Sequence, residues 1–164
     1  MSELPGSVGN SQEHIDYVRS HPQNHCFVCS SKEVGSWNLK LTNENDRVTA
    51  PMWVPKCFQG YEGVVHGGVA ATFLDEVMGY AVLANEGKHA VTQRLKLTYL
   101  RPVMVEKAYQ VTARVINKLD GACSVSGEIV DDAGTIHVSG VALFKCIADP
   151  FMLAPQEITT HSEK

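Results

Sequence analysis

Apolar residues recur at spacings of three and four between residues 67 and 85, and this period predicts one long amphipathic helix. Its apolar stripe comprises Ala70, Phe73, Leu74, Val77, Met78 and Ala81. Asn85 and Gly87 provide a C-terminal stop, because both residue types tolerate the left-handed backbone that ends many helices. We expect this to be the only long helix of the chain.

The segments on both sides of that helix alternate between apolar and polar residues, which is typical of strands. Residues 37–41 and 47–54 flank a polar cluster and predict a first hairpin, in which Pro51 and Pro55 confine the second strand to an edge or shorten it. Four consecutive meander strands follow the helix, at residues 91–99, 109–115, 123–129 and 136–146. A sheet must cover the helical stripe, so we expect an α+β hot-dog fold, an antiparallel sheet wrapped around one long central helix.

The length of the chain, 164 residues, is typical of one domain. We divide it into an N-terminal leader at 1–24, a hot-dog domain at 25–148 and a C-terminal tail at 149–164. The leader contains a predicted short helix over residues 11–19, where Ile15 and Val18 form a narrow apolar stripe.

Composition and charge exclude several classes of protein. Fourteen basic against eighteen acidic side chains give a net charge of -4, so no nucleic-acid partner is expected. No strongly apolar stretch reaches the ~20 residues of a membrane span, and no membrane partner is expected. The first ten residues lack the basic and apolar parts of a secretory signal, and an odd count of five cysteines favours reduced thiols. These features predict a cytoplasmic protein.

Two glycines, Gly67 and Gly68, stand at the entrance of the predicted helix. Free backbone amides at a helix N-terminus attract an anion or a polarised carbonyl oxygen, and glycine lets a ligand approach the backbone closely. The same pair would also serve a tight helix entry without any ligand. His66, beside them, either donates to such an oxygen or makes a structural hydrogen bond.

Asp75 and Glu76 lie on opposite flanks of the helical stripe, each about 130° from its centre. Either is a candidate general base or nucleophile, and either could be a solvated surface carboxylate. Gly67 and Asp75 are eight residues apart, or ~12 Å of helix rise, so one helix cannot present both to the same small carbonyl group. Two antiparallel helices related by a two-fold axis could do so, which predicts a site shared between subunits.

Residues 61–68 (YEGVVHGG), Asp75 and residues 99–102 (YLRP) together resemble the PaaI-type branch of the hot-dog acyl-CoA thioesterases, over about residues 26–146. The resemblance implies that Gly67 offers its amide to the thioester oxygen and that Asp75 attacks the carbonyl carbon or activates water. It implies hydrolysis of an acyl-CoA to a free carboxylic acid and CoA, with no cofactor, by a homodimer or a dimer of dimers (a homotetramer).

The chain departs from this family pattern in two places. Many members carry Asn or Gln where this chain has Gly60, with Gln59 one residue away, and some carry a hydroxyl residue where it has Gly79. We expect Gly68, Gln59 and Arg101 to bind substrate, Arg101 through the phosphates of CoA.

The segment Cys26-Phe27-Val28-Cys29 has the spacing of half a zinc site. Neither Cys57 nor the scattered histidines supply a second pair at a suitable spacing, and the βαβ context of a redox motif is absent, so no metal is expected. Two alternatives to a thioesterase stay open. One is a non-catalytic acyl-CoA binding module, which would not need Asp75, and the other is a hot-dog hydratase, whose usual His/Asp pairing on the helix is not seen.

Overall fold

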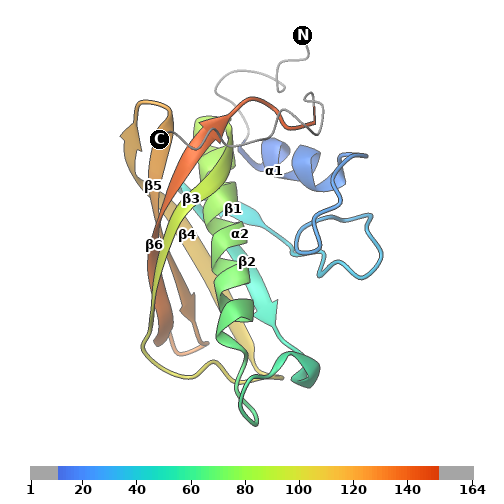
Figure 1. Cartoon of the computed structure of the whole chain (residues 1–164), viewed down its shortest axis with the longest axis vertical. Coiled ribbons are helices and arrows are strands. Elements are labelled where there is room, and N and C mark those ends of the chain that lie inside the picture. The colour runs from blue at the N-terminus through green and yellow to red at the C-terminus, as the bar shows by residue number, and fades with distance from the viewer. Residues whose placement is uncertain (1–10, 152–164) are drawn as a thin grey trace, which may run out of the picture.

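The computed structural model describes residues 11–151, and it contains two α-helices, a short 3-10 turn and a six-stranded antiparallel sheet (Figure 1). The helices are α1 (Ser11–Ser20) and α2 (Gly67–Glu86), and the 3-10 turn is η1 (Lys56–Phe58). The strands are β1 (Thr42–Glu44), β2 (Arg47–Trp53), β3 (His89–Tyr99), β4 (Ala108–Leu119), β5 (Ala122–Val130) and β6 (Ile136–Ile147). The ends of the predicted leader and tail, residues 1–10 and 152–164, lie outside the described residues.

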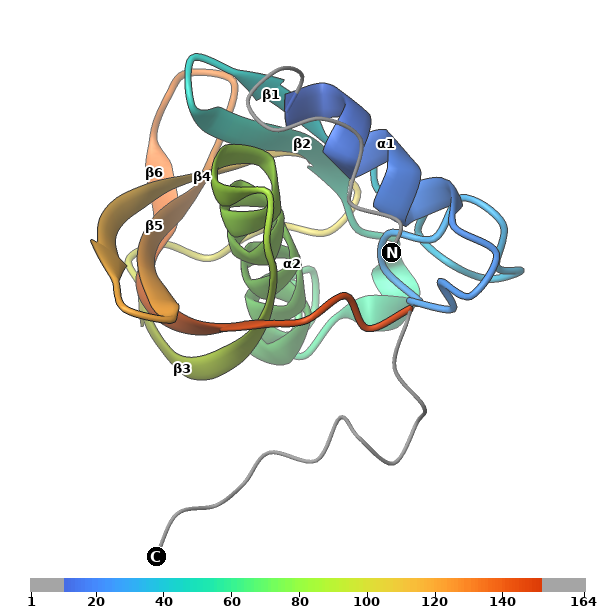
Figure 2. The same cartoon turned by 90° about the horizontal axis from the view of Figure 1, so that it is seen from above.

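Helix α2 is the predicted long helix, and the sheet curls around it as expected for a hot-dog fold (Figure 2). All six residues of the predicted stripe are buried. The helix ends at Gly87, whose φ of 60° is left-handed and whose amide donates to the carbonyl oxygen of Leu83. The short helix predicted in the leader is also confirmed, as α1, with Ile15 fully buried.

Helix α2 is long and apolar enough to cross a membrane, judged by length and composition only, which contradicts the expectation that no segment of the chain is. It has 20 residues, and its most apolar window has a mean hydropathy of 1.2. However, 56% of that window is buried inside the domain, and the core helix of a globular protein meets the same criterion. Its position inside the curled sheet accounts for its apolar character.

The order of the strands is β1-β2-β4-β5-β6-β3, so the predicted four-strand meander is wrong for β3. This strand pairs with β6 at the far edge of the sheet. The segment that follows it passes beneath the N-terminal end of α2, where the amide of Val65 donates to the carbonyl of Val103 and that of Val105 to the carbonyl of Gly63 (Figure 1). Because β3 is an edge strand, its apolar side chains Leu95 and Leu97 are only half-buried.

The first hairpin forms further along the chain than predicted. Residues 37–41 contain the buried Leu39 and Leu41 but are not a strand, and β1 follows them. Asn45 and Asp46 both have positive φ and make the tight turn into β2. Among the described strands β1 pairs only as far as Thr49, so Pro51 lies in a part of β2 with one neighbouring strand, in keeping with its expected edge position.

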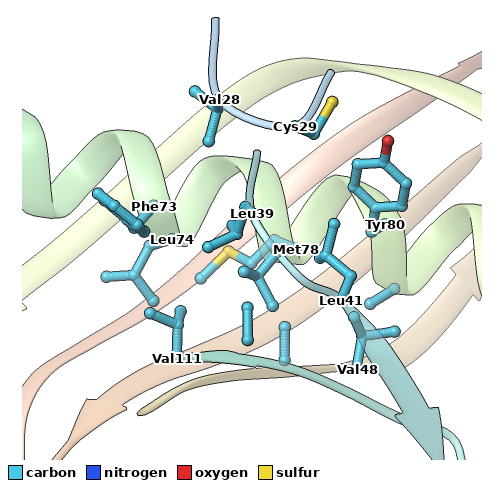
Figure 3. Close-up of a cluster of buried hydrophobic side chains, with 14 of the residues drawn as sticks. Val28, Cys29, Leu39, Leu41, Val48, Phe73, Leu74, Met78, Tyr80 and Val111 are labelled. Carbon is cyan, nitrogen blue, oxygen red and sulfur yellow. The ribbon is translucent and has the colours of Figure 1, made fainter. Parts of the chain in front are cut away.

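The core lies between α2 and the elements around it (Figure 3). Figure 3 shows Val48 and Val111 of the sheet on one side of α2 and Val28 and Cys29 of the N-terminal segment on the other. The side of the helix that the sheet leaves open is therefore covered by the segment that contains the CxxC sequence.

Candidate functional site

The N-terminal end of α2 borders a pocket of about 430 Å³. Its lining includes Gly60, Tyr61, His66, Gly67, Tyr99 and Arg101. These residues come from the segment before α2, from the first turn of the helix and from the end of β3. The structure thus brings the two parts of the family-like motif, residues 61–68 and 99–102, to one place.

His66 is the N-cap of α2. Its Nδ1 accepts a hydrogen bond of 3.0 Å from the amide of Gly68. This leaves the proton of a neutral imidazole on Nε2, where it can be donated. The amide of Gly68 is engaged within the protein, so the geometry does not favour the substrate contact predicted for it. No hydrogen bond among the described residues uses the amide of Gly67.

Tyr99 fixes the helix entrance from the other side. Its hydroxyl donates to the carbonyl oxygen of Gly67 at 2.7 Å, and its ring atoms lie 3.6 Å from the position of a Cβ on Gly67. Partial desolvation raises the pKa of Tyr99, so the phenol stays protonated and keeps this bond. Sequence reasoning used Tyr99 only as part of a motif, because its contact with a residue 32 positions earlier depends on where β3 lies in the sheet.

Arg101 and Gln59 occupy different surroundings. Arg101 is exposed at the rim of the pocket, and its Nη1 donates to the carbonyl of Ile136 at 2.7 Å. The side chain of Gln59 braces the loop before α2, since its Oε1 accepts from the amide of Gly63 at 3.1 Å. Gly60 rather than Gln59 lines the pocket.

Asp75 lies in a second pocket of about 420 Å³, on the flank of α2. The hydroxyl of Thr92 in β3 donates to its Oδ1 at 2.6 Å, which holds the carboxylate in one orientation. Sequence reasoning missed Thr92 because it looked for a hydroxyl one helical turn after Asp75, at Gly79. The fold supplies the hydroxyl from the neighbouring strand β3 instead. The signal in the sequence that could have pointed to Thr92 was the alternating pattern of this strand, which directly follows the helix.

Glu76 faces a different set of groups in the same pocket. The thiol of Cys26 lies 3.5 Å from its Oε1, and burial raises the pKa of Glu76 to about 8. A hydrogen bond from the Cys29 thiol lowers the pKa of Cys26, and the same interaction raises the pKa of Cys29. Asp75 is therefore the carboxylate paired with a neutral hydroxyl, while Glu76 belongs to a cluster with the two thiols.

Gly67 and Asp75 line two separate pockets, and neither of these pockets contains both residues. The first offers hydrogen-bond donors and the positive end of the helix dipole, and the second offers carboxylates. This separation within one chain agrees with the ~12 Å expected from their spacing along the helix.

The family comparison covers this region of the chain. A sequence model of the thioesterase superfamily matches residues 62–138, a range that includes His66, Gly67, Asp75, Thr92 and Tyr99. Over this range the chain is similar to the thioesterase superfamily. The hot-dog fold predicted from the sequence and the resemblance to PaaI-type members are both confirmed.

Among curated proteins, an uncharacterised protein of Schizosaccharomyces pombe is 33% identical over 72 residues, which are 43% of this chain and 41% of that protein. A solved thioesterase superfamily protein, RHA08564, is 27% identical with a TM-score of 0.68, over 73% of this chain and 62% of its own. The chain thus spans less than two thirds of the length of either relative.

Two further solved structures share the fold. The PaaI protein of the Escherichia coli phenylacetic acid degradation operon has a TM-score of 0.62 at 19% identity, over 68% of this chain and 80% of its own. A Streptococcus mutans protein bound to acetyl CoA has a TM-score of 0.63 at 18% identity, over 68% of this chain and 90% of its own.

Proposed function

We propose that this protein hydrolyses an acyl-CoA thioester to a free carboxylic acid and CoA, in a site that two subunits share. The observation that carries the proposal is the division of the chemistry on α2. Gly67, whose amide no hydrogen bond within residues 11–151 uses, lines one pocket, and Asp75, whose carboxylate Thr92 orients, lines the other. The match of residues 62–138 to the thioesterase superfamily supports the reaction, and acetyl CoA bound to the Streptococcus mutans protein of the same fold supports the ligand class.

The Gly67 pocket would polarise the thioester. As a nucleophile adds to the carbonyl carbon, negative charge develops on the oxygen, and the amide of Gly67 stabilises it together with the positive end of the α2 dipole. The Nε2 proton of His66 is a second donor at the same entrance. One such donor is typically worth ~10²- to 10³-fold in kcat.

Asp75 would supply the attacking group. As a nucleophile, its carboxylate forms a mixed anhydride and expels CoA as a thiolate, and water then hydrolyses the anhydride. As a general base, it takes a proton from a water molecule that attacks directly. Both routes need an oriented carboxylate, which the hydrogen bond from Thr92 to Oδ1 provides. No hydrogen bond among the described residues occupies Oδ2.

The two half-sites would meet across a two-fold axis, with two α2 helices antiparallel. Strand β3 supports this arrangement, because it is the last strand in the sheet order and has a strand neighbour on one side only among the described residues. It carries both Thr92, at the Asp75 pocket, and Tyr99, at the Gly67 pocket. We infer that Arg101, exposed at the rim, contacts a phosphate of CoA.

The test is a panel of acyl-CoA thioesters of different chain length and polarity, assayed by the release of free thiol. We expect turnover of at least one member by wild-type protein and its loss in Asp75→Asn. Binding of acyl-CoA without any turnover across the panel would contradict a thioesterase and favour the non-catalytic binding module.

A further inference from the structure

We propose that Cys26, Cys29 and Glu76 form a binding site for a thiophilic divalent cation such as Zn²⁺. The two sulfur atoms and a carboxylate oxygen lie within 4.8 Å of one another. The sequence spacing predicted no metal because it offered only the CxxC pair. The fold adds a third donor from α2, 50 residues further along the chain. This proposal replaces the earlier expectation and does not depend on the proposed hydrolysis.

The CxxC loop already has the shape that metal ligation needs. The amide of Val28 donates to the sulfur of Cys26 at 3.4 Å, and the side-chain amide of Asn24 donates to the sulfur of Cys29 at 3.6 Å. The amide of Ser30 donates to the carbonyl of Cys26 at 3.1 Å and closes the turn that places both sulfurs on one side. The donor directed at the sulfur of Cys26 favours its thiolate, which is the form that binds metal.

The position of Glu76 also suits a tetrahedral site. With Zn–S bonds of ~2.3 Å and Zn–O bonds of ~2.1 Å, a sulfur and an oxygen ligand are ~3.6 Å apart. The distance from the sulfur of Cys26 to Oε1 of Glu76 is 3.5 Å. The neighbouring Asp75 is not a ligand in this arrangement, because it is not part of the group of donor atoms that lie within 4.8 Å of one another.

A buried polar group next to the cluster points to the fourth position. Tyr80 is only 6% exposed, and its buried hydroxyl interacts with the side chain of Cys29 without making a hydrogen bond of full geometry among the described residues. Figure 3 shows the Tyr80 ring directing this hydroxyl toward the side of α2 where Cys29 lies. A water molecule on the metal would complete the coordination and give the Tyr80 hydroxyl a hydrogen bond of full geometry.

The experiment is a titration of Co²⁺ into the full chain, purified with a chelator and kept reduced by a phosphine. Thiolate-bound tetrahedral Co²⁺ absorbs by charge transfer in the near ultraviolet. We expect saturation at about one Co²⁺ per chain, loss of the band on addition of Zn²⁺, and a higher Tm with Zn²⁺ than without. Absence of a charge-transfer band in the folded wild-type protein would overturn the proposal.

Matched variants assign the ligands. Cys26→Ser and Cys29→Ser should abolish the band, and Glu76→Gln should weaken Co²⁺ binding by about tenfold or more. Cys57→Ser, at an exposed thiol, and Asp75→Asn, at the adjacent carboxylate, should retain it. Circular dichroism checks the fold of each variant. A band that survives Cys26→Ser or disappears in Cys57→Ser would place the metal elsewhere and contradict the proposed site.

Discussion

The two pockets along α2 are nearly equal in size and opposite in chemistry. The pocket at the helix N-terminus, about 430 Å³, presents the amide of Gly67, the phenol of Tyr99 and the guanidinium of Arg101. The pocket around Asp75, about 420 Å³, presents two carboxylates and two thiols. In the proposed reaction, the first pocket would stabilise developing negative charge, and the second would supply a nucleophile or base. Each pocket holds only one of the two kinds of group that the proposed reaction needs, so the reaction needs one pocket from each of two copies of the chain.

The largest effect on kcat should come from a change at Asp75. Asp75→Asn should lower kcat by about 10²-fold or more, because the amide cannot attack or take a proton. Glu76→Gln, one residue along, should reduce kcat much less, since its carboxylate faces the thiols. Steady-state kinetics of the two folded variants decides between them. A greater loss in Glu76→Gln would mean that the wrong carboxylate has been assigned.

A change at Gly67 should lower kcat almost as strongly. In Gly67→Val the added Cβ lies 3.6 Å from the ring of Tyr99, and the side chain would cover the amide that we propose polarises the thioester. We expect kcat to fall by roughly 10²-fold, as for the loss of one oxyanion donor. Thermal unfolding provides the control for folding. Normal kcat in a stable Gly67→Val protein would remove the amide from the mechanism.

Thr92 tests whether orientation of Asp75 matters. Thr92→Val keeps the shape of the side chain and removes the 2.6 Å hydrogen bond to Oδ1, so kcat should fall roughly tenfold, or ~1.4 kcal/mol. Thr92→Ser retains a hydroxyl and should recover most of the activity. Equal losses in both variants would indicate that Thr92 acts through packing and not through its hydroxyl.

The smallest effect should be that of Tyr99→Phe. This change removes the 2.7 Å bond to the carbonyl of Gly67 but keeps the ring that packs beside the helix entrance. We expect the free energy of unfolding to fall by ~1 kcal/mol and kcat by only a few fold. Urea unfolding and kinetics measure the two quantities. An effect as large as that of Gly67→Val would make the phenol part of the chemistry.

The sequence predicted the features that depend on local pattern. The 3.6-residue period identified α2, and Gly87 marked its end, because both signals lie within the segment itself. The candidate pair Gly67 and Asp75 followed from the helix entrance and from the family resemblance. The sequence could not predict the pockets that these residues line, since residues from segments far apart in the chain shape each of them.

What the sequence could not predict were contacts between distant segments. The partner of β3 is β6 and not β4, because a strand's own residues do not encode which edge it joins. Thr92 reaches Asp75, and Glu76 reaches Cys26, only because β3 and the N-terminal segment pack on α2. The sequence left His66 with two possible roles, as a donor to a substrate oxygen or as a structural hydrogen-bonding residue. The hydrogen bond that its Nδ1 accepts from the amide of Gly68 accounts for the structural role.

Subunit mixing tests the shared site most directly. Asp75→Asn and Gly67→Val proteins, each nearly inactive alone, are combined under conditions that exchange subunits, and mass spectrometry verifies the exchange. With random exchange half of the dimers are mixed, and each mixed dimer has one intact site of two, so activity should approach about a quarter of the wild-type value. No recovery after verified exchange, with both variants folded, would contradict a site built from Gly67 of one subunit and Asp75 of the other.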